Sequence, residues 1–169
     1  KIVLNTISKK TKVLHGHFIF RDVAHIVKKN NSKVVVWFRD PIERVISRYY
    51  FLMKKIEENP NHPKISFKND TLLDFAKRPS QQNMMSRFVH GIDLEELFFF
   101  GFLETFNDDM ANLANKLGWE SYQVPHNNSN TKYRKKHENS ISEEEKHQLT
   151  LLNKKDIDLY NRAQKLKNK

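Results

Sequence analysis

A short apolar run followed at once by a helix start is the feature that most constrains the fold. Residues Lys33 to Phe38 are β-branched or aromatic after the first, do not alternate with polar residues, and are too few for a helix. They predict a strand buried on both faces, as in a parallel sheet. Asp40, Pro41 and Glu43 then supply an acidic N-cap, a proline at the first helical position and the glutamate of a capping box. A helix is therefore expected from about Pro41 to a point before Pro60.

Strand-like and helix-like segments alternate along the rest of the chain. The run 97–101 predicts a second strand, and 121–124 a third. Helices are expected at 71–76, 81–89 and 107–117, and after Ser142 and Asn153. This alternation indicates an α/β fold in one domain over residues 1–169, in which ligands bind outside the carboxyl ends of the strands. Arg39 follows such an end.

Composition narrows the classes of function. The net charge of +10 favours polyanionic partners such as nucleic acid, anionic glycans, phosphorylated nucleotides or acidic lipid surfaces. The absence of cysteine excludes disulfides, thiolate catalysis and cysteine-ligated zinc. No apolar run approaches the roughly 18 residues of a membrane-spanning helix, and no signal peptide is recognisable. A soluble protein of the cytoplasm is the resulting expectation.

Arg39 and Ser47 are candidates for binding an anion. Arg39 places a guanidinium at the predicted strand end, and Ser47 lies seven residues after Asp40, nearly two helical turns on and on the same face. A phosphate there would gain a donor from each side chain and the positive end of the helix. In the alternative interpretation, Arg39 pairs with Asp40 or Glu43, and Ser47 bonds to a backbone carbonyl.

The stretch from Val34 to Tyr50 resembles the strand and helix that bind the donor's 3′-phosphate in Golgi-type carbohydrate sulfotransferases. The resemblance extends over about 14–163 and is closest to the heparan sulfate and uronyl 2-O-sulfotransferases. It implies that Arg39 and Ser47 hold the 3′-phosphate of 3′-phosphoadenosine-5′-phosphosulfate. It also implies a three-layer, P-loop-NTPase-like fold around a central parallel sheet.

Two histidines flank a glycine upstream of the strand. His15, Gly16 and His17 resemble the His-Gly-His segment of the uronyl 2-O-sulfotransferases, which implies that His17 takes the proton of the acceptor hydroxyl and that His15 orients or replaces it. An imidazole with a pKa of about 6.5 can accept such a proton at neutral pH. As alternatives, the tripeptide is a turn or half of a metal site. The implied reaction itself needs no metal.

Later segments supply the remaining candidates. The resemblance places Asn83 and Arg87 opposite an acidic sugar, whose carboxylate an arginine can grip with two hydrogen bonds; a solvated helix surface is the alternative. It makes Thr131 and Lys132, in a basic segment that resembles the loop closing over the nucleotide, contacts of the donor; a solvated loop is the alternative. Glu104 is expected to pair with a lysine or to cap the following helix rather than to act in catalysis.

Together the resemblance predicts transfer of a sulfonate group from 3′-phosphoadenosine-5′-phosphosulfate to a hydroxyl of an anionic or uronic-acid-containing glycan. The family's 5′-phosphosulfate loop and the strand before it are not found, so a domain truncated at its amino terminus is expected. Alternatives are a sulfonucleotide- or glycan-binding module without turnover, and a basic nucleic-acid-binding domain around Arg44, Arg48 and 132–136, which leaves the ordered matches unexplained. If the chain is an excised part of a eukaryotic membrane enzyme, its expected location is the Golgi lumen instead of the cytoplasm.

Overall fold

The computed structural model describes residues 10–123, 131–137 and 141–168. Its elements follow in chain order as α1 (Phe20–Asn30), β1 (Val35–Phe38), α2 (Pro41–Glu58), α3 (Leu72–Lys77), α4 (Met84–Phe88), β2 (Phe99–Phe102), α5 (Phe106–Leu117), α6 (Thr131–His137), α7 (Glu143–Leu152) and α8 (Lys154–Lys167). Short 3₁₀ turns lie at η2 (Ile65–Phe67), η3 (Pro79–Gln81) and η4 (Leu94–Glu96). In the described part, no helix is both long enough and apolar enough to cross a membrane.

The two strands form a small parallel sheet, in which Val35 pairs with Phe99 and Phe38 with Phe102. Alternate side chains point to opposite faces of a strand. Phe38 and Phe102 face the core cluster that also contains Tyr160 of α8. The predicted α/β class is confirmed as a helix-rich chain with a parallel sheet of two described strands.

Two expectations about the strands were wrong. Of β1, only Phe38 is buried, whereas Val35 and Trp37 are half-buried. The face opposite Phe38 is covered only in part, since Trp37 packs on Phe106 of α5 with ring centroids 4.6 Å apart and stays half-buried. The third expected strand is also not observed, because 121–123 has no regular structure, while Val124 lies outside the described residues.

Helix α2 begins at Pro41, as predicted, but its cap differs from the predicted capping box. The Asp40 carboxylate accepts hydrogen bonds from the backbone N–H groups of Ile42 and Glu43, at 2.9 and 2.8 Å. The backbone N–H of Asp40 donates to Glu104 Oε1 at 2.7 Å instead of to Glu43. The carboxylate of Glu104, which follows β2, therefore completes the cap of α2. The side chain of Glu43 is available for other contacts.

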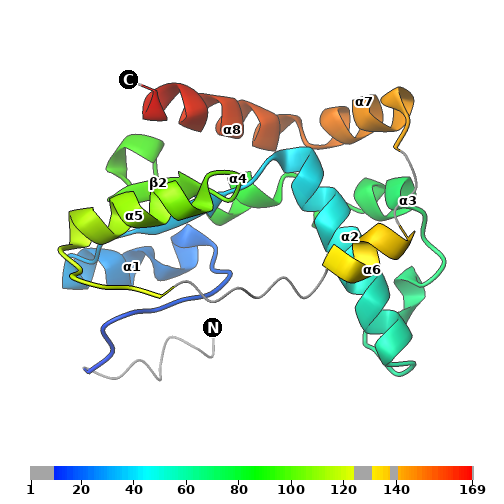
Figure 1. The fold of residues 1–169 in the computed structure, drawn as a ribbon, viewed down its shortest axis with the longest axis horizontal. Coiled ribbons are helices and arrows are strands. Elements are labelled where there is room, and N and C mark those ends of the chain that lie inside the picture. The colour runs from blue at the N-terminus through cyan, green and yellow to red at the C-terminus, as the bar shows by residue number, and fades with distance from the viewer. Residues whose placement is uncertain (1–9, 124–130, 138–140, 169) are drawn as a thin grey trace.

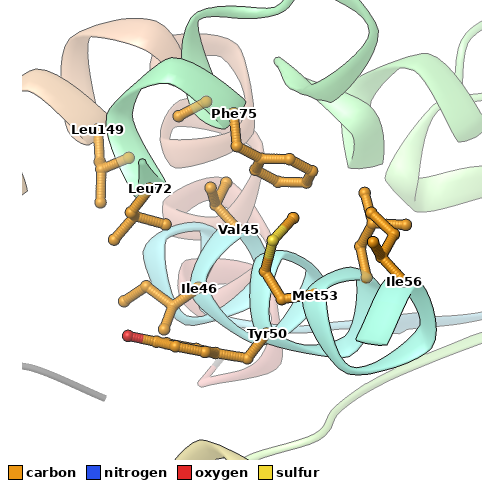
Figure 2. Packing of buried hydrophobic residues seen from close by; sticks show 10 residues of the cluster. Val45, Ile46, Tyr50, Met53, Ile56, Leu72, Phe75 and Leu149 are labelled. Carbon is orange, nitrogen blue, oxygen red and sulfur yellow. The ribbon is translucent and has the colours of Figure 1, made fainter. Parts of the chain in front are cut away.

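The apolar face of α2 packs against α3 and α7 in a second core cluster (Figure 2). Val45 and Leu149 are almost fully buried there, and Phe75 of α3 is only 1% exposed. Burying one such side chain contributes roughly 1.5–3 kcal/mol. This packing fixes α2 along its length, and α6 lies beside it (Figure 1).

Helix α1 was not predicted, although its sequence carries an amphipathic pattern. Val23 is its buried residue, and Asn31 ends the helix in the left-handed conformation with φ of 47°. Figure 1 shows α1 and α8 on opposite sides of the sheet. Gly118 ends α5 in the same way, with φ of 69°, as the sequence indicated.

Candidate functional site

Arg39 directly follows β1, at the carboxyl end of the strand where the sequence placed an anion site. Its side chain is 29% exposed, and Nη2 lies 3.7 Å from Oε2 of Glu43, one helical turn further on. This is the pairing that the sequence left open as an alternative. The separation is too long for a good hydrogen bond, so it leaves the guanidinium's donors available for an anion.

Glu43 has a second and closer partner in Arg134 of α6. Nη1 and Nη2 of Arg134 donate to the two carboxylate oxygens of Glu43 at 2.7 and 3.2 Å. The hydrogen bond from Arg134 lowers the pKa of Glu43 despite partial burial, and the positive charge of Arg39 adds to this effect. The sequence placed Arg134 in a basic segment but did not indicate its pairing with Glu43, because no local pattern links residues 91 positions apart.

Ser47 lies one turn beyond Glu43 on α2 and is half-buried. Among the described residues, its hydroxyl has no hydrogen-bond partner, so the expected alternative bond to a backbone carbonyl is not observed there. Glu43 and Ser47 are four apart on α2 and share a face, and the guanidinium of Arg39 lies 3.7 Å from the Glu43 carboxylate. An anion that both side chains bind would be a neighbour of the Glu43 carboxylate.

The start of α2 contributes less to an anion site than the sequence suggested. The backbone N–H groups of Ile42 and Glu43 already donate to the Asp40 carboxylate. An approaching phosphate would therefore find those two donors occupied, and would meet a negative charge at the cap. The proposed anion site at this strand end therefore depends on the side chains of Arg39 and Ser47 rather than on the backbone of the helix start.

A cluster of arginines extends from Arg39 toward α4. Arg44 is mostly buried, and its Nε lies 3.9 Å from Oδ2 of Asp156. Burial lowers the pKa of Arg44, Asp156 opposes that effect, and the nearby charges of Arg48, Arg87 and Arg39 reinforce it. An arginine nevertheless stays protonated in proteins. The region between α2 and α4 is therefore electropositive.

Asn83 immediately precedes α4 and binds the start of α8. Its backbone is left-handed, with φ of 49°, and its N–H donates to Oδ1 of Asn153 at 3.1 Å. Its Oδ1 accepts from the N–H groups of Lys155 and Asp156 at 2.9 and 3.3 Å. Asn83 thus caps α8 from a distant part of the chain, and its expected role toward an acidic sugar stays a prediction.

Asp156 in turn caps the start of α4. Its buried carboxylate accepts from the N–H groups of Met85 and Ser86 at 3.0 and 2.8 Å, and from Ser86 Oγ at 2.7 Å. We call the pair Asn83 and Asp156 the reciprocal cap. Each helix supplies the residue that satisfies the first N–H groups of the other.

Arg87 lies on the exposed side of α4. Its guanidinium donates to the carbonyl oxygens of Pro79 and Ser80 at 3.2 and 3.0 Å. These bonds tie α4 to η3 and hold the side chain in one place. Contact with a carboxylate of the acceptor stays a prediction for this residue.

The two candidate bases lie upstream of α1 and are exposed. The chain bends at Gly16, and the ring of His17 lies 5.8 Å from that of Phe88 at the end of α4. His17 is therefore close to the helix that carries Arg87. Within the described residues, no contact joins His15 or His17 to Arg39 or Ser47.

Glu104 corrects an expectation. Its two carboxylate oxygens accept from the backbone N–H of Asp40 at 2.7 Å and from the hydroxyl of Tyr160 at 3.2 Å. It therefore caps α2, and within the described residues it neither pairs with a lysine nor caps the following helix α5. Burial of Tyr160 and its neighbour Glu104 raise the pKa of this tyrosine.

Two further candidates are placed only in part. Thr131 and Lys132 are the first residues of α6, and their side chains lie outside the described part. Their predicted contact with the donor stays a prediction.

Among the residues that the structure describes, no group of three histidine, aspartate or glutamate side chains could hold a metal ion.

Arg39 just after β1, Ser47 on α2 and the electropositive margin beside them would suit one class of ligand, an anionic group. Comparison with known families is consistent with this class, since residues 4–162 match the model of the sulfotransferase family. The chain belongs to the sulfotransferase family. No curated protein and no solved structure matches it significantly.

Proposed function

We propose that the chain transfers a sulfonate group from 3′-phosphoadenosine-5′-phosphosulfate to a hydroxyl of a carbohydrate, as the heparan sulfate and uronyl 2-O-sulfotransferases that it resembles do. The position of Arg39 at the carboxyl end of β1, with Ser47 two turns into α2, is the observation that carries this proposal. Family membership supports the transfer of sulfonate. The three-layer, P-loop-like layout of that family is part of the same proposal.

The donor's 3′-phosphate suits these residues chemically. A guanidinium can give a phosphate two parallel charge-assisted hydrogen bonds, and a hydroxyl can give a third. Arg39 is partly exposed, and the Ser47 hydroxyl has no partner within the described part of the chain. As far as the described residues show, both donors can therefore turn to a ligand without the loss of an existing hydrogen bond.

His17 is the residue that we assign to proton removal. In the proposed step its imidazole takes the proton of the acceptor hydroxyl while that oxygen bonds to sulfur. The bond from sulfur to the phosphate oxygen breaks, and adenosine 3′,5′-bisphosphate leaves. His17 is exposed and packs on Phe88, beside the arginines that would attract an anionic glycan. Arg87 and Asn83 are the proposed contacts of that acceptor.

Calorimetric titration with adenosine 3′,5′-bisphosphate tests the donor site directly. The wild-type chain is expected to bind it more tightly than 5′-AMP, because only the bisphosphate carries the 3′-phosphate. Arg39→Ala should weaken the binding of the bisphosphate by roughly tenfold or more, and Ser47→Ala should weaken it by roughly threefold to tenfold, since each change removes a hydrogen bond to a charged group. The matched controls are Arg21→Ala and Ser66→Ala, which alter exposed residues outside the proposed site.

The outcomes separate the candidate functions. Equal binding of the bisphosphate and 5′-AMP, or equal losses in the control variants, would contradict a 3′-phosphate site. Specific binding followed by sulfonate transfer to a glycan that depends on His17 would support the enzyme. Specific binding without transfer would favour a sulfonucleotide-binding module.

A further inference from the structure

The Glu43 carboxylate creates an electrostatic problem at the proposed donor site. Oε2 of Glu43 lies 3.7 Å from Nη2 of Arg39, on the side of α2 that leads to Ser47. A phosphate held by Arg39 and Ser47 would carry a charge close to this carboxylate. Like charges at roughly 6 Å in a half-exposed site repel enough to weaken binding about fivefold to tenfold. Glu43 would thus oppose the binding that Arg39 promotes.

Arg134 is placed to remove this opposition. Its guanidinium meets both oxygens of Glu43, at 2.7 and 3.2 Å, in the two-pronged geometry that is strongest between these groups. The side chain of Arg134 is 24% exposed and that of Glu43 is 42% exposed, so water screens the pair only in part. The carboxylate is therefore matched by a positive charge from another helix.

We propose that Arg134 neutralises Glu43 and so leaves the charge of Arg39 available for the 3′-phosphate of the donor. The inference rests on the proposed function, and it assigns Arg134 a part that acts through Glu43. Arg134 is accordingly a positioning residue for the donor site. A second contact holds α6 on α2, since the Tyr133 hydroxyl donates to Glu57 at 2.6 Å near the end of that helix.

Two other roles for Arg134 make different predictions. If Arg134 touched the phosphate itself, its loss would weaken binding whether or not Glu43 were charged. If Arg134 only held α6 in place, its loss would lower the stability of the fold and would weaken the binding of the bisphosphate and of 5′-AMP alike. Neutralisation through Glu43 instead predicts that removal of the Glu43 charge cancels the effect of removing Arg134. A double-mutant cycle distinguishes these cases.

The experiment titrates adenosine 3′,5′-bisphosphate and 5′-AMP into the wild-type chain and into Glu43→Gln, Arg134→Gln and the double variant. Arg134→Gln should weaken the binding of the bisphosphate by roughly fivefold to tenfold, with little change in the binding of 5′-AMP. Glu43→Gln should bind the bisphosphate at least as tightly as the wild type, although it breaks the same ion pair. The double variant should bind within about twofold of Glu43→Gln.

Lys135→Ala is the control, since it removes an exposed positive charge from the next position of α6. It should change the affinity by less than about twofold, because exposed charges are screened by water. Thermal melts of every variant confirm folding. If Arg134→Gln does not fold, Glu43→Gln still tests the inference, because a loss of affinity in that variant would overturn it.

Equal loss from Arg134→Gln in both backgrounds would overturn the inference, as would an unchanged affinity in Arg134→Gln. Binding that depends on Arg39 but not on Arg134 would overturn the inference alone. A folded wild-type chain with no preference for the 3′-phosphate would overturn the proposed function, and the inference with it.

Discussion

Replacing Asp156 with alanine should destabilise the protein more than any other single change to a charged side chain considered above. The Asp156 carboxylate is buried and accepts three hydrogen bonds, from the N–H groups of Met85 and Ser86 and from the Ser86 hydroxyl. It is also the nearest negative charge to the mostly buried Arg44, at 3.9 Å. Alanine removes all of these interactions at once.

The magnitude follows from the groups left without partners. Each backbone N–H that loses its acceptor in a buried position costs about 1–3 kcal/mol. Breaking a buried charge pair by removing one partner costs about 3–5 kcal/mol, although at 3.9 Å this pair is long. Relaxation and entering water recover part of the sum, so we expect a loss of about 3–5 kcal/mol in the free energy of unfolding.

Urea unfolding followed by circular dichroism measures this loss, provided that the slope of the transition is unchanged. Asp158→Ala is the control, because Asp158 is exposed on the same helix, and it should cost less than about 0.5 kcal/mol. Asp156→Asn, which keeps the shape and one acceptor oxygen, should lie between the two. A loss below about 1 kcal/mol in Asp156→Ala would refute the importance of the reciprocal cap.

Two further predictions concern the sheet and its neighbour α5. Burial of Asp109 opposes its ionisation, but hydrogen bonds from Lys167 and the Phe102 N–H lower its pKa overall. The resulting stability is present above the ordinary aspartate pKa of about 3.9 and is lost as the pH falls through the lower pKa of the folded state. Urea unfolding measured across this pH range should show that the stability of Asp109→Asn depends less on acid than that of the wild type. The same dependence of stability on pH in both proteins would contradict this. Gly101→Ala should cost about 1–3 kcal/mol in thermal or urea unfolding, because its Cβ would lie 2.5 Å from the Trp37 ring; a neutral result would show that the ring moves freely.

Local signals located several helix starts, although the helix expected at 81–89 is only α4, Met84–Phe88. Asp40 with Pro41 located the start of α2, and Ser142 with Glu145 forms the capping box that begins α7. These signals act within one turn of helix, so the sequence contains both partners. Arg39 and Ser47 were proposed from one strand–helix segment and from a family resemblance. Their binding of an anion stays a prediction.

Contacts between distant segments could not be predicted in this way. Glu104 displaces Glu43 from the α2 cap across 64 residues, and Arg134 takes the freed carboxylate. Asn83 was expected opposite an acidic sugar, with a solvated helix surface as the alternative, and the contact of its amide with the start of α8 was not foreseen. In each case the competing partner is chosen by how helices pack, which a single sequence does not reveal. Sequence reasoning therefore found the proposed anion-binding residues but missed the charge that accompanies them.

The reciprocal cap also has a consequence for motion. Asn83 and Asp156 are joined across 73 positions, so the first turns of α4 and α8 are held by each other rather than by residues within their own segments. Neither turn can open alone without exposing the N–H groups of its partner. Amide hydrogen exchange at Met85, Ser86 and Lys155 should accordingly proceed through one shared opening event, with closely similar protection. The short helix beside the candidate base His17 thus takes its rigidity from the last helix of the chain.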